Sequence, residues 1–453
     1  MIAPARVAAY QALLALSNGR ADLPGAIDHA RTTLADDRDQ ALMAEIVTGV
    51  QRWRAALDHL IVQFSKRALD RLDPEVIEIL RLSLYQLLHL TRVPAAAVVD
   101  DAVKLAGKAG KRSASGLVNA VLRTASRQRR SLPLPRRPRD GSNREALLEY
   151  LSVSLSHPQW LVNRWLARFG FEATEAWLTF NNTPSPLTLR ANTLVITPSD
   201  LAARLAERGV VTRPGAFAPG ALIVEAGNPL KRGQDIRSEW FVIQNEASQL
   251  VTLLAGPRPG SLLLDACASP GGKATAFAAA VGSTGRVIAC DVRARRMTLL
   301  RRTVERTRAE NVALVRADVL QALPFRALFD SVVVDAPCSG LGTLRRDPDI
   351  RWRRVESDLP ALASAQLRML ANAADRVARG GRLVYATCSS EPEENEDVAG
   401  QFLAAAAQFR AVDARTVHPD LSPALVDARG HFRTAPDRDD LEAFFGAIFE
   451  RIL

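Results

Sequence analysis

The chain has 453 residues, of which 47% are hydrophobic and 24% charged, a composition typical of a globular protein with two or three domains. It contains no run of 18 apolar residues, so no membrane-spanning segment is predicted. A formal net charge of +10 favours a polyanionic partner. The four cysteines show no CxxC pairing and no clustered histidine, which argues against a disulfide framework or a bound metal and favours a reducing cytoplasm.

Residues 1–130 predict an all-helical domain of five to seven helices. Val76, Leu80 and Leu84 repeat at the spacing of one apolar helix face. The preceding residues supply a start signal, with Asp73 as the expected cap and Pro74 at the first helical position.

Two basic segments follow one another in this half of the chain. Residues 104–112 carry four bases, and residues 123–139 carry seven arginines without an acid. Such blocks neutralise phosphates with little dependence on sequence. Arg, Pro, Ser and Gly dominate from Ser126 to Asn143, which predicts a semi-stiff linker, placed at 131–150, rather than a packed element. The composition leaves open whether this linker contacts RNA or is only a solvated tether.

Residues 151–243 predict a small α+β region, with a helix from His157 and strands at 187–194 and 221–225. Residues 244–453 then alternate short apolar runs with helical stretches. This alternation is typical of a three-layer, Rossmann-like α/β domain with a mostly parallel sheet. The strand-like runs are 262–264, 286–289, 313–315, 332–334 and 383–385.

The turn from Asp265 to Lys273 joins the first of these strands to a helix. Gly271 and Gly272 allow a ligand to approach the backbone closely, and the helix N-terminus favours a carboxylate. Asp291 ends the next strand, where an acid can accept hydrogen bonds from both ribose hydroxyls. Asp318 follows the third strand and is placed to meet an adenine amino group. Together these features favour adenosine, and S-adenosylmethionine rather than NAD, because no arginine clamp for a pyrophosphate is evident.

Cys338 and Cys388 each follow a predicted buried strand, so both thiols are expected at the carboxyl edge of the sheet. Carbon 5 of a pyrimidine is a poor nucleophile, and thiolate addition to carbon 6 activates it. Asp335 can accept a hydrogen bond from the exocyclic amine of cytosine. Lys273 can donate to the ring oxygen or orient the base, although a solvated lysine is an equal reading. A free cysteine is commonly a small buried apolar residue, and this stays the alternative reading for Cys338 and Cys388. It is the role expected of Cys290, while Cys267 is expected to contribute backbone to the loop.

Three segments carry a resemblance to a known family, the RNA cytosine-carbon-5 methyltransferases: residues 265–274, 335–352 and 383–396. With the N-terminal half, the chain resembles the bacterial RsmB (Sun or Fmu) type, which modifies one cytosine of small-subunit (16S) ribosomal RNA. Residues 76–103 and 116–123 resemble the helical NusB-type RNA-binding domain of that type. Residues 157–165 and 190–193 are similar to its middle region.

The resemblance implies roles for particular residues. Cys388 is the implied nucleophile, and Cys338 the implied residue for product release. The segment that would hold S-adenosylmethionine or border its methyl group comprises Cys267, Ala268, Ser269, Pro270, Gly271, Gly272 and Lys273, together with Asp291, Asp318 and Asp335. The chain departs from the family pattern at Ser269, where Ala is frequent, and at Asn245, where Asp is frequent. It also lacks the usual Asp-Gly within residues 439–445.

The sequence therefore predicts a multidomain protein. Its expected parts are a NusB-like helical domain (1–130), an Arg/Pro-rich linker (131–150), a middle α+β region (151–243) and a methyltransferase domain (244–453). The expected activity is transfer of a methyl group from S-adenosylmethionine to carbon 5 of a cytosine in small-subunit ribosomal RNA, by a cytoplasmic monomer without metal or membrane. The alternatives are a methyltransferase acting on transfer RNA or another RNA, and a non-catalytic RNA-binding factor for assembly or antitermination.

Overall fold

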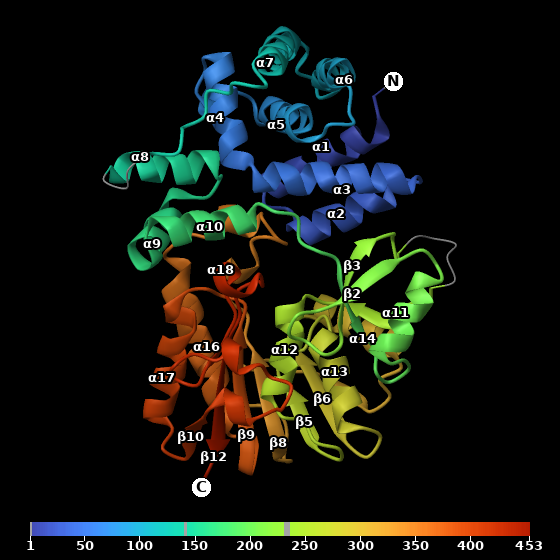
Figure 1. Ribbon diagram of the computed structural model, residues 1–453, viewed down its shortest axis with the longest axis vertical. Helices are drawn as coiled ribbons and strands as arrows, with labels where there is room; N and C mark the ends of the chain where they lie inside the picture. Colours follow the sequence, from blue (N-terminus) through green and yellow to red (C-terminus); the bar gives the residue numbers. More distant parts are fainter. Residues whose placement is uncertain (1, 140–142, 231–235) are drawn as a thin grey trace. The chain divides into compact units, whose positions relative to one another are not determined.

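The computed structural model describes residues 2–139, 143–230 and 236–453. The chain forms two compact units, each described here by itself. The first comprises residues 1–184 together with 344–356, and the second comprises residues 185–343 and 357–453. The elements of both are labelled in Figure 1.

The first unit is helical in its described residues, and its first 130 residues fold as helices, as predicted. Its helices are α1 (Pro4–Ser17), α2 (Leu23–Thr32), α3 (Asp37–Arg52), α4 (Arg54–Ser65), α5 (Pro74–His89), α6 (Ala95–Lys108), α7 (Ser115–Arg127), α8 (Arg144–Glu149), α9 (Gln159–Phe169), α10 (Phe171–Asn181) and α15 (Ile350–Arg353).

Helix α5 lies in the core of this unit. Val76, Ile79 and Leu80 are at most 2% exposed, as their helical spacing predicts. Pro74 starts the helix, but the predicted side-chain cap is wrong, because Asp73 makes no capping hydrogen bond. Its carboxylate instead lies 3.1 Å from Nζ of Lys111. The ammonium group of Lys111 thus binds the carboxylate of Asp73, which would otherwise accept a hydrogen bond from the backbone of α5.

The arginine- and proline-rich segment packs against the helices, so the prediction that it is not a packed element is wrong for its described part. Leu132 and Leu134 lie against the hydrophobic core of the first unit. The carbonyl of Pro135 accepts a hydrogen bond from Ser154 at 2.7 Å. Arg137 pairs with Glu172 and Glu175, at 2.9 and 2.8 Å. Apolar residues between the prolines supply this packing, which composition alone does not reveal. Residues 140–142 of the predicted linker lie outside the described residues.

The segment 344–356 leaves the second unit in sequence and folds with the first. Arg351, at its centre, is fully buried. Its guanidinium donates to the carbonyl of Ser156 at 2.9 Å and to Oδ1 of Asn182 at 3.0 Å, with longer contacts to three further carbonyls. Trp352 donates from its indole nitrogen to the carbonyl of Gln51 at 2.6 Å. Polar contacts thus anchor this segment among α3, α9 and α10.

The second unit contains two sheets and the remaining helices. Its elements are β1 (Thr188–Ala191), α11 (Pro198–Ala206), β2 (Val211–Pro214), β3 (Ala221–Ala226), β4 (Phe241–Ile243), α12 (Glu246–Leu254), β5 (Leu262–Asp265), α13 (Gly272–Val281), β6 (Arg286–Asp291), α14 (Ala294–Thr307), β7 (Val312–Arg316), β8 (Phe329–Asp335), α16 (Asp358–Ala374), β9 (Val377–Thr387), α17 (Glu396–Ala405), β10 (Phe409–Val412), β11 (Phe432–Arg433), α18 (Pro436–Asp439) and β12 (Phe445–Arg451).

The smaller sheet has the antiparallel order β2-β3-β1-β4, and α11 lies beside it. The larger sheet has the order β10-β12-β9-β8-β5-β6-β7, with β11 paired to β12. Strands β5 to β9 pair in parallel, as predicted, whereas β12 runs antiparallel between β9 and β10.

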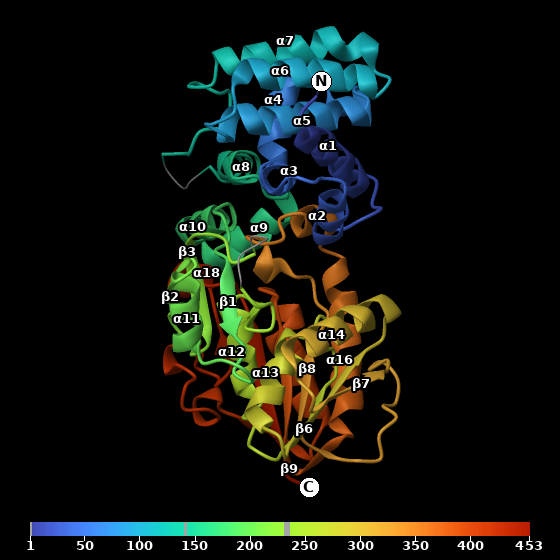
Figure 2. The same ribbon diagram turned by 90° about the vertical axis from the view of Figure 1, so that its right-hand side faces the viewer.

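Alternation along the parallel strands separates two apolar cores, one on each face of the sheet. Val333 and Val384 pack with α12, α13 and α14, and Val332 and Val334 pack with α16 and α17. Helices α12, α13, α14 and α16 are labelled in Figure 2, and α17 in Figure 1. Both faces are covered, which explains why the strands read as continuous apolar runs.

Among the described residues, no helix combines the length and apolarity that crossing a membrane requires.

Candidate functional site

The predicted site residues gather where the order of the parallel strands reverses. The chain proceeds from β5 through β6 to β7 in one direction, and β8 and β9 lie on the other side of β5. Ligands of open α/β sheets bind in the crevice at such a switch point. The loop after β5 and the turn after β8 both open there, which brings residues 265–273 close to Asp335 and Cys338.

The sulfur atoms of Cys338 and Cys388 lie 3.3 Å apart. Backbone contacts fix this approach, because the amide of Gly342 donates to the carbonyl of Cys388 at 3.0 Å. Position 342 has no room for a side chain, since an added Cβ would collide with the carbonyls of Ala443 and Cys388. The two strand ends predicted from the sequence thus deliver their thiols to one point.

A buried carboxylate connects the segments that carry the two cysteines. Glu394 is fully buried and accepts hydrogen bonds from the amide of Ser339 at 2.8 Å and the hydroxyl of Ser389 at 2.6 Å. Gln366 of α16 donates to the same carboxylate at 2.9 Å. Sequence reasoning missed Glu394, although it lies six residues after Cys388 in an acidic turn. Such turns are usually solvated, so only the fold distinguishes this glutamate.

Lys273 and Asp335 form an ion pair beside the thiols, with Nζ 2.6 Å from Oδ2. Burial opposes the charge on Lys273, but Asp335, and more weakly Asp265 and Cys388, raise the pKa of its ammonium above the ordinary value. Lys273 therefore stays protonated at neutral pH. Its positive charge interacts with Cys388 across the site.

The surroundings of Cys338 oppose ionisation of its thiol. The contact with Cys388, followed by burial, raises the pKa of the Cys338 thiol well above the ordinary value. Cys338 therefore holds its proton at neutral pH. Burial also raises the thiol pKa of Cys267 and Cys290, which agrees with the expectation that neither supplies a thiolate.

The loop after β5 adopts a tight turn, and contacts within the protein leave little room for a side chain at Gly271 and Gly272. Gly271 has φ of +108°, and an added Cβ would lie 2.9 Å from Cδ1 of Leu300. An added Cβ on Gly272 would lie 3.3 Å from the side chain of Gln244. Close packing around α13 thus requires a small residue at both positions, and the approach of a ligand to this backbone stays a prediction. Ala268, Ser269 and Pro270 form the turn between the strand and these glycines.

Asp291 and Asp318 lie at the ends of β6 and β7, as their positions in the sequence predict. Asp291 is 5% exposed, and its Oδ1 accepts from the amide of Arg293 at 3.1 Å. Oδ1 of Asp318 accepts from the amide of Leu320 at 2.9 Å. One carboxylate oxygen of each aspartate thus accepts a hydrogen bond from the backbone of the loop that follows it.

Asp265, the last residue of β5, was not singled out as a site residue by the sequence. It is 1% exposed, and apart from the backbone of Cys267 no described residue donates a hydrogen bond to its carboxylate. Burial, with help from the nearby charge of Asp335, raises the pKa of Asp265 to about 7. The strand-end position that identified Asp291 and Asp318 would also have identified Asp265. A buried carboxylate with so few donors fits a ligand that supplies more of them.

Of the three departures from the family pattern, Asn245 and the turn within residues 439–445 lie against each other. Asn245 caps α12, accepting from the amide of Ser248 at 2.7 Å, and its amide nitrogen donates to Glu442. An aspartate at position 245 has no such donor. In the turn without Asp-Gly, Asp440 takes a left-handed conformation with φ of +54°, so the expected disturbance of turn geometry falls on this residue.

Comparison with known proteins identifies three regions of the chain. Residues 251–450 match the family described as 16S rRNA methyltransferase RsmB/F, residues 3–127 match the NusB family, and residues 157–231 match a ferredoxin-like domain of RsmF/B-like methyltransferases. The predicted resemblance and fold class are thereby confirmed: a NusB-like helical region, an α+β middle region and a Rossmann-like methyltransferase domain.

Relatives of similar length match over most of the chain. The ribosomal RNA small subunit methyltransferase B of Pseudomonas putida is 34% identical, with 91% of each chain covered. The protein of the same name from Vibrio cholerae is 30% identical and covers 98% of this chain and 97% of its own. Among solved structures, PH0851 superimposes with a TM-score of 0.81 at 24% identity, covering 100% of this chain and 99% of its own. A methyltransferase homologue from Pyrococcus horikoshii gives 0.58 at 26% identity, covering 68% and 99%.

The identity and coverage of these relatives are sufficient to assign the chain, and the described site lies within the matched methyltransferase region. The chain belongs to the RsmB/F family of 16S rRNA methyltransferases.

Proposed function

We propose that the chain transfers a methyl group from S-adenosylmethionine to carbon 5 of a cytosine in small-subunit ribosomal RNA, through a covalent adduct between Cys388 and carbon 6. The observation that carries this proposal is the 3.3 Å approach of the two thiols beside the Lys273–Asp335 ion pair. A cysteine that only fills space in the core does not require a second thiol in contact with it. The names of the curated relatives support the choice of ribosomal RNA.

The residues around the switch point fit the cofactor. Asp291 would accept from the ribose hydroxyls, Asp318 would meet the adenine amine, and the backbone of residues 267–273 would line the ligand. The buried carboxylate of Asp265, which has the backbone of Cys267 as its one donor among the described residues, would accept hydrogen bonds from the amino-acid end of the cofactor. S-adenosylmethionine supplies an electrophilic methyl group on a sulfonium and leaves as S-adenosylhomocysteine.

We assign the nucleophile to Cys388, the role that the resemblance to RNA cytosine-carbon-5 methyltransferases implies for this position. The positive charge of Lys273 interacts with Cys388. The Cys388 thiolate forms a bond to carbon 6 with its own electron pair, which makes carbon 5 nucleophilic toward the methyl group. After carbon 5 has gained the methyl group, its proton must leave and the bond between sulfur and carbon 6 must break.

Cys338 would assist that last step. Its thiol can donate a proton to the departing sulfur of Cys388 at 3.3 Å, and the resulting Cys338 thiolate can take the proton from carbon 5. The pair then holds one proton more than at the start and returns it to solvent before the next turnover.

Asp335 would select cytosine. Its Oδ2 is held by Lys273, and Oδ1 makes no hydrogen bond to another described residue, so it can accept from the exocyclic amine. Uracil presents a carbonyl at that position and would be repelled. The target base must leave its stack, because carbon 6 is inaccessible within one.

The proposal also includes the division of labour expected from the sequence. Residues 1–130 and the arginine-rich linker 131–150 would bind the RNA backbone, residues 151–243 would form the middle region, and residues 244–453 would carry the chemistry.

A paired trap tests the mechanism. Cys388→Ala and Cys338→Ala proteins are incubated with S-adenosylmethionine and unmethylated small-subunit RNA, and the products are separated on denaturing gels. We expect only the Cys338→Ala protein to retain RNA covalently, because its adduct forms but is not released. Cys290→Ala is the matched control, since this buried strand cysteine lies outside the proposed chemistry, and it should methylate RNA without accumulating an adduct.

If neither variant traps RNA and both still methylate it, the two-thiol mechanism is wrong. Labelled methyl uptake by separate pools of small-subunit, large-subunit and transfer RNA tests the substrate independently. Preferential uptake by transfer RNA would contradict the proposed substrate while leaving the mechanism intact.

A further inference from the structure

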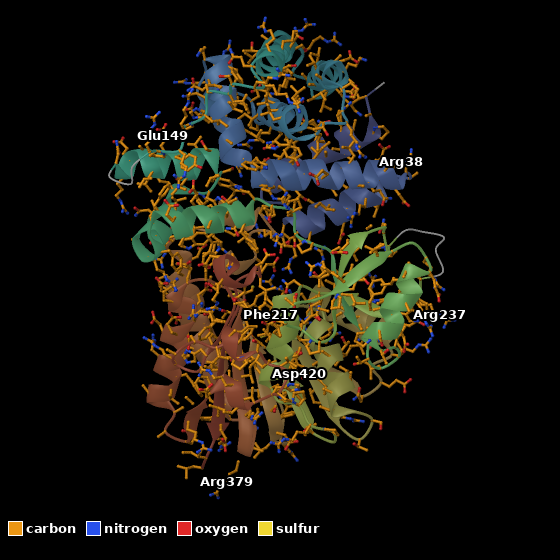
Figure 3. The ribbon with its side chains drawn as sticks, viewed as in Figure 1. Arg38, Glu149, Phe217, Arg237, Arg379 and Asp420 are labelled. Atoms are coloured by element: carbon orange, nitrogen blue, oxygen red, sulfur yellow. The ribbon has the colours of Figure 1, made fainter. Side chains whose placement is uncertain are left out.

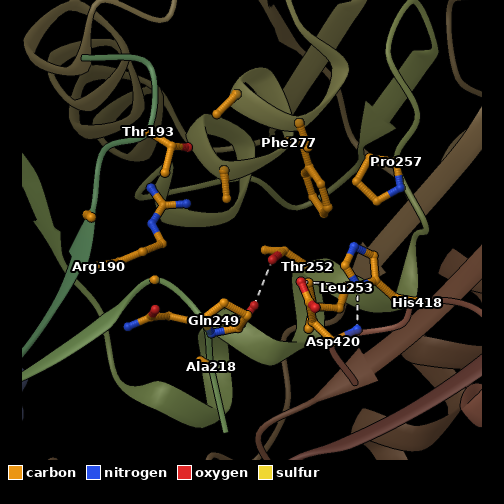
Figure 4. A pocket seen from close by; sticks show the side chains of 16 residues that line it. Arg190, Thr193, Ala218, Gln249, Thr252, Leu253, Pro257, Phe277, His418 and Asp420 are labelled. Atoms are coloured by element: carbon orange, nitrogen blue, oxygen red, sulfur yellow. Dashed lines mark hydrogen bonds and ion pairs between the residues drawn. The ribbon is translucent and has the colours of Figure 1, made fainter. Parts of the chain in front are cut away.

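A cavity of about 260 Å³ lies in the second unit, between the smaller sheet and helices α12 and α13. Figure 4 shows its lining, with Arg190 at one side and His418 and Asp420 at the other. None of its lining residues is a proposed cysteine or belongs to the loop 265–273. The cavity is therefore distinct from the site of the proposed chemistry.

Arg190 brings a buried positive charge to this cavity without a matching negative charge. Its side chain belongs to a residue only 7% exposed, and Nη2 donates to Oγ1 of Thr275 at 2.8 Å. Nε is buried without a partner, and no described carboxylate forms an ion pair with the guanidinium. Burial, and then the like charge of Arg306, lowers the pKa of Arg190 to about 10, so the guanidinium remains protonated at neutral pH. An unpaired buried cation is costly, and an anionic ligand would relieve the cost.

The wall beside Arg190 contains a second unsatisfied group. Gln249 of α12 is 4% exposed, and its Oε1 is buried without a hydrogen-bond partner among the described residues. Its amide nitrogen already donates to the carbonyl of Gln244 at 2.9 Å. Oε1 therefore requires a donor, which a hydroxyl or amine of a ligand can provide after a small side-chain rotation.

The opposite side of the cavity offers an acceptor. The amide of Asp420 donates to Nδ1 of His418 at 3.2 Å, and the Asp420 carboxylate lies 3.9 Å from the same nitrogen. Leu253, Pro257 and Phe277 provide an apolar wall between the two polar ends. A suitable ligand has an anionic group at one end, hydrogen-bond donors at the other and an apolar surface between them.

We propose that this cavity is a second ligand site, which takes one nucleoside monophosphate unit with its phosphate on Arg190. An arginine fork matches phosphate oxygens in geometry and charge, and the sugar hydroxyls or base amine supply the donors for Gln249 and Asp420. The cavity is smaller than the roughly 300–1,000 Å³ of typical sites for drug-sized ligands, which suits a single nucleotide. The unit is either a free nucleotide or one residue of an RNA strand.

The site connects to the cofactor loop through one side chain. Thr275, which receives the hydrogen bond from Arg190, lies 3.0 Å from the carbonyl of Gly271 and 3.1 Å from that of Gly272 through its Oγ1. A phosphate bound to Arg190 would therefore contact a side chain that is hydrogen-bonded to Thr275, and through Thr275 to the loop 265–273. The proposal itself concerns binding and does not depend on methyl transfer.

Isothermal titration calorimetry on the full chain tests it, with saturating S-adenosylhomocysteine present to occupy the cofactor site. The probes are cytidine 5′-monophosphate, cytidine and a tetraribonucleotide. We expect the monophosphate to bind at least tenfold more tightly than cytidine, because only the former carries the anion for Arg190.

Two variants address the cavity and two serve as controls. Ala280→Phe fills the cavity from an exposed position of α13, and Arg190→Gln removes the charge. Both should weaken binding of the monophosphate at least tenfold. Ala361→Phe places the same side chain on an exposed face of α16, and Arg379→Gln removes an exposed charge at the end of the unit away from Asp420 (Figure 3). Both controls should bind as the unchanged protein does.

If Ala280→Phe binds the monophosphate normally, or cytidine binds equally well, the proposal is overturned. Because Ala280 is exposed, this result does not depend on whether Arg190→Gln folds. Tighter binding of the tetraribonucleotide, lost in the same variants, assigns the site to RNA, whereas binding of the monophosphate alone assigns it to a free nucleotide. Neither result depends on the covalent trap, so failure here and failure of the proposed methyl transfer are distinguishable.

Discussion

At the scale of single residues, the surroundings of the Asp265 carboxylate indicate which groups a ligand must supply. Its carboxylate lies buried at the end of β5, and in the described part of the chain only the backbone of Cys267 donates to it. The pKa of about 7 lies well above the ordinary 3.8, mainly because burial disfavours the charge. Between these values the folded protein holds one more proton than the unfolded chain. Stability of the ligand-free protein therefore falls as pH rises from about 4 through 7.

Binding of S-adenosylmethionine should show the opposite dependence on pH. Its positive charges and donors favour the ionised carboxylate, so Asp265 must lose its proton when the cofactor binds below pH 7. We expect affinity to fall by up to about tenfold per pH unit below 7. Calorimetric titrations from pH 5.5 to 8 measure this slope, and protons should be released on binding at pH 6.

Asp265→Asn and Asp375→Asn complete that experiment. The first removes the titrating carboxylate and should flatten the pH dependence while lowering affinity at pH 8. The second changes an exposed aspartate of the same unit and should leave the slope intact. An unchanged slope in Asp265→Asn would assign the pH dependence to another group.

Sequence reasoning at the scale of residues succeeded where chemistry follows from strand ends. Cys338, Cys388, Asp335 and Lys273 meet because parallel strands end at one edge of a sheet. The buried groups that hold these residues in place could not be predicted in the same way. Glu394 and its partner Gln366 lie 28 residues apart and are separated by a strand. Their burial arises only when α16 and the turn after β9 pack together.

At the scale of elements, the segment 344–356 depends on a buried guanidinium. Arg351→Met would leave the carbonyls of Arg52, Ser156 and Asn181 without this donor. Buried groups that lose a partner cost about 1–3 kcal/mol each before relaxation. We expect Arg351→Met to lower the unfolding free energy of the first unit by roughly 2–4 kcal/mol, measured by urea denaturation.

Arg353→Met is the matched control within the same short helix. Its side chain is 49% exposed and pairs with Asp349 at 2.9 Å. Asp349 is buried, but its Oδ2 also accepts a hydrogen bond from the amide of Leu23 at 3.1 Å. Because one donor remains, this variant should lose clearly less stability than Arg351→Met. Equal losses in the two variants would show that α15 as a whole, rather than the buried guanidinium, is responsible.

The turn before β12 provides a second test on an element. Asp440 is exposed and left-handed, at φ of +54°, a conformation that costs a residue with a Cβ about 1–2 kcal/mol. Asp440→Gly should therefore be at least as stable as the unchanged protein, and Asp440→Val about 1–2 kcal/mol less stable than the glycine variant. Thermal unfolding compares the two. At Asp437, inside the short helix α18, glycine should be the less stable replacement.

Periodicity predicted the parallel strands and the helices of the first unit, because burial on both faces or on one stripe appears directly in the sequence. It did not predict that residues 344–356 fold with the first unit or that β12 inserts between β9 and β10. Both are pairings between segments far apart in the chain. A buried arginine and a late antiparallel strand carry no local pattern that reveals their partners.

At the scale of the whole molecule, the net charge of +10 predicts salt-dependent binding to RNA. Arg129, Arg130 and Arg136 are exposed and have no ion pair with a described residue. Each phosphate contact on single-stranded nucleic acid contributes about 0.7 to the slope of log K against log salt. Replacing all three by Gln should therefore reduce that slope by about 2, measured by filter binding of small-subunit RNA from 50 to 200 mM salt. Arg137→Gln is the control, because Glu172 and Glu175 already neutralise Arg137, and its slope should stay the same. An unchanged slope in the triple variant would place the RNA on another basic surface, because charge that contacts phosphate must appear in the salt dependence.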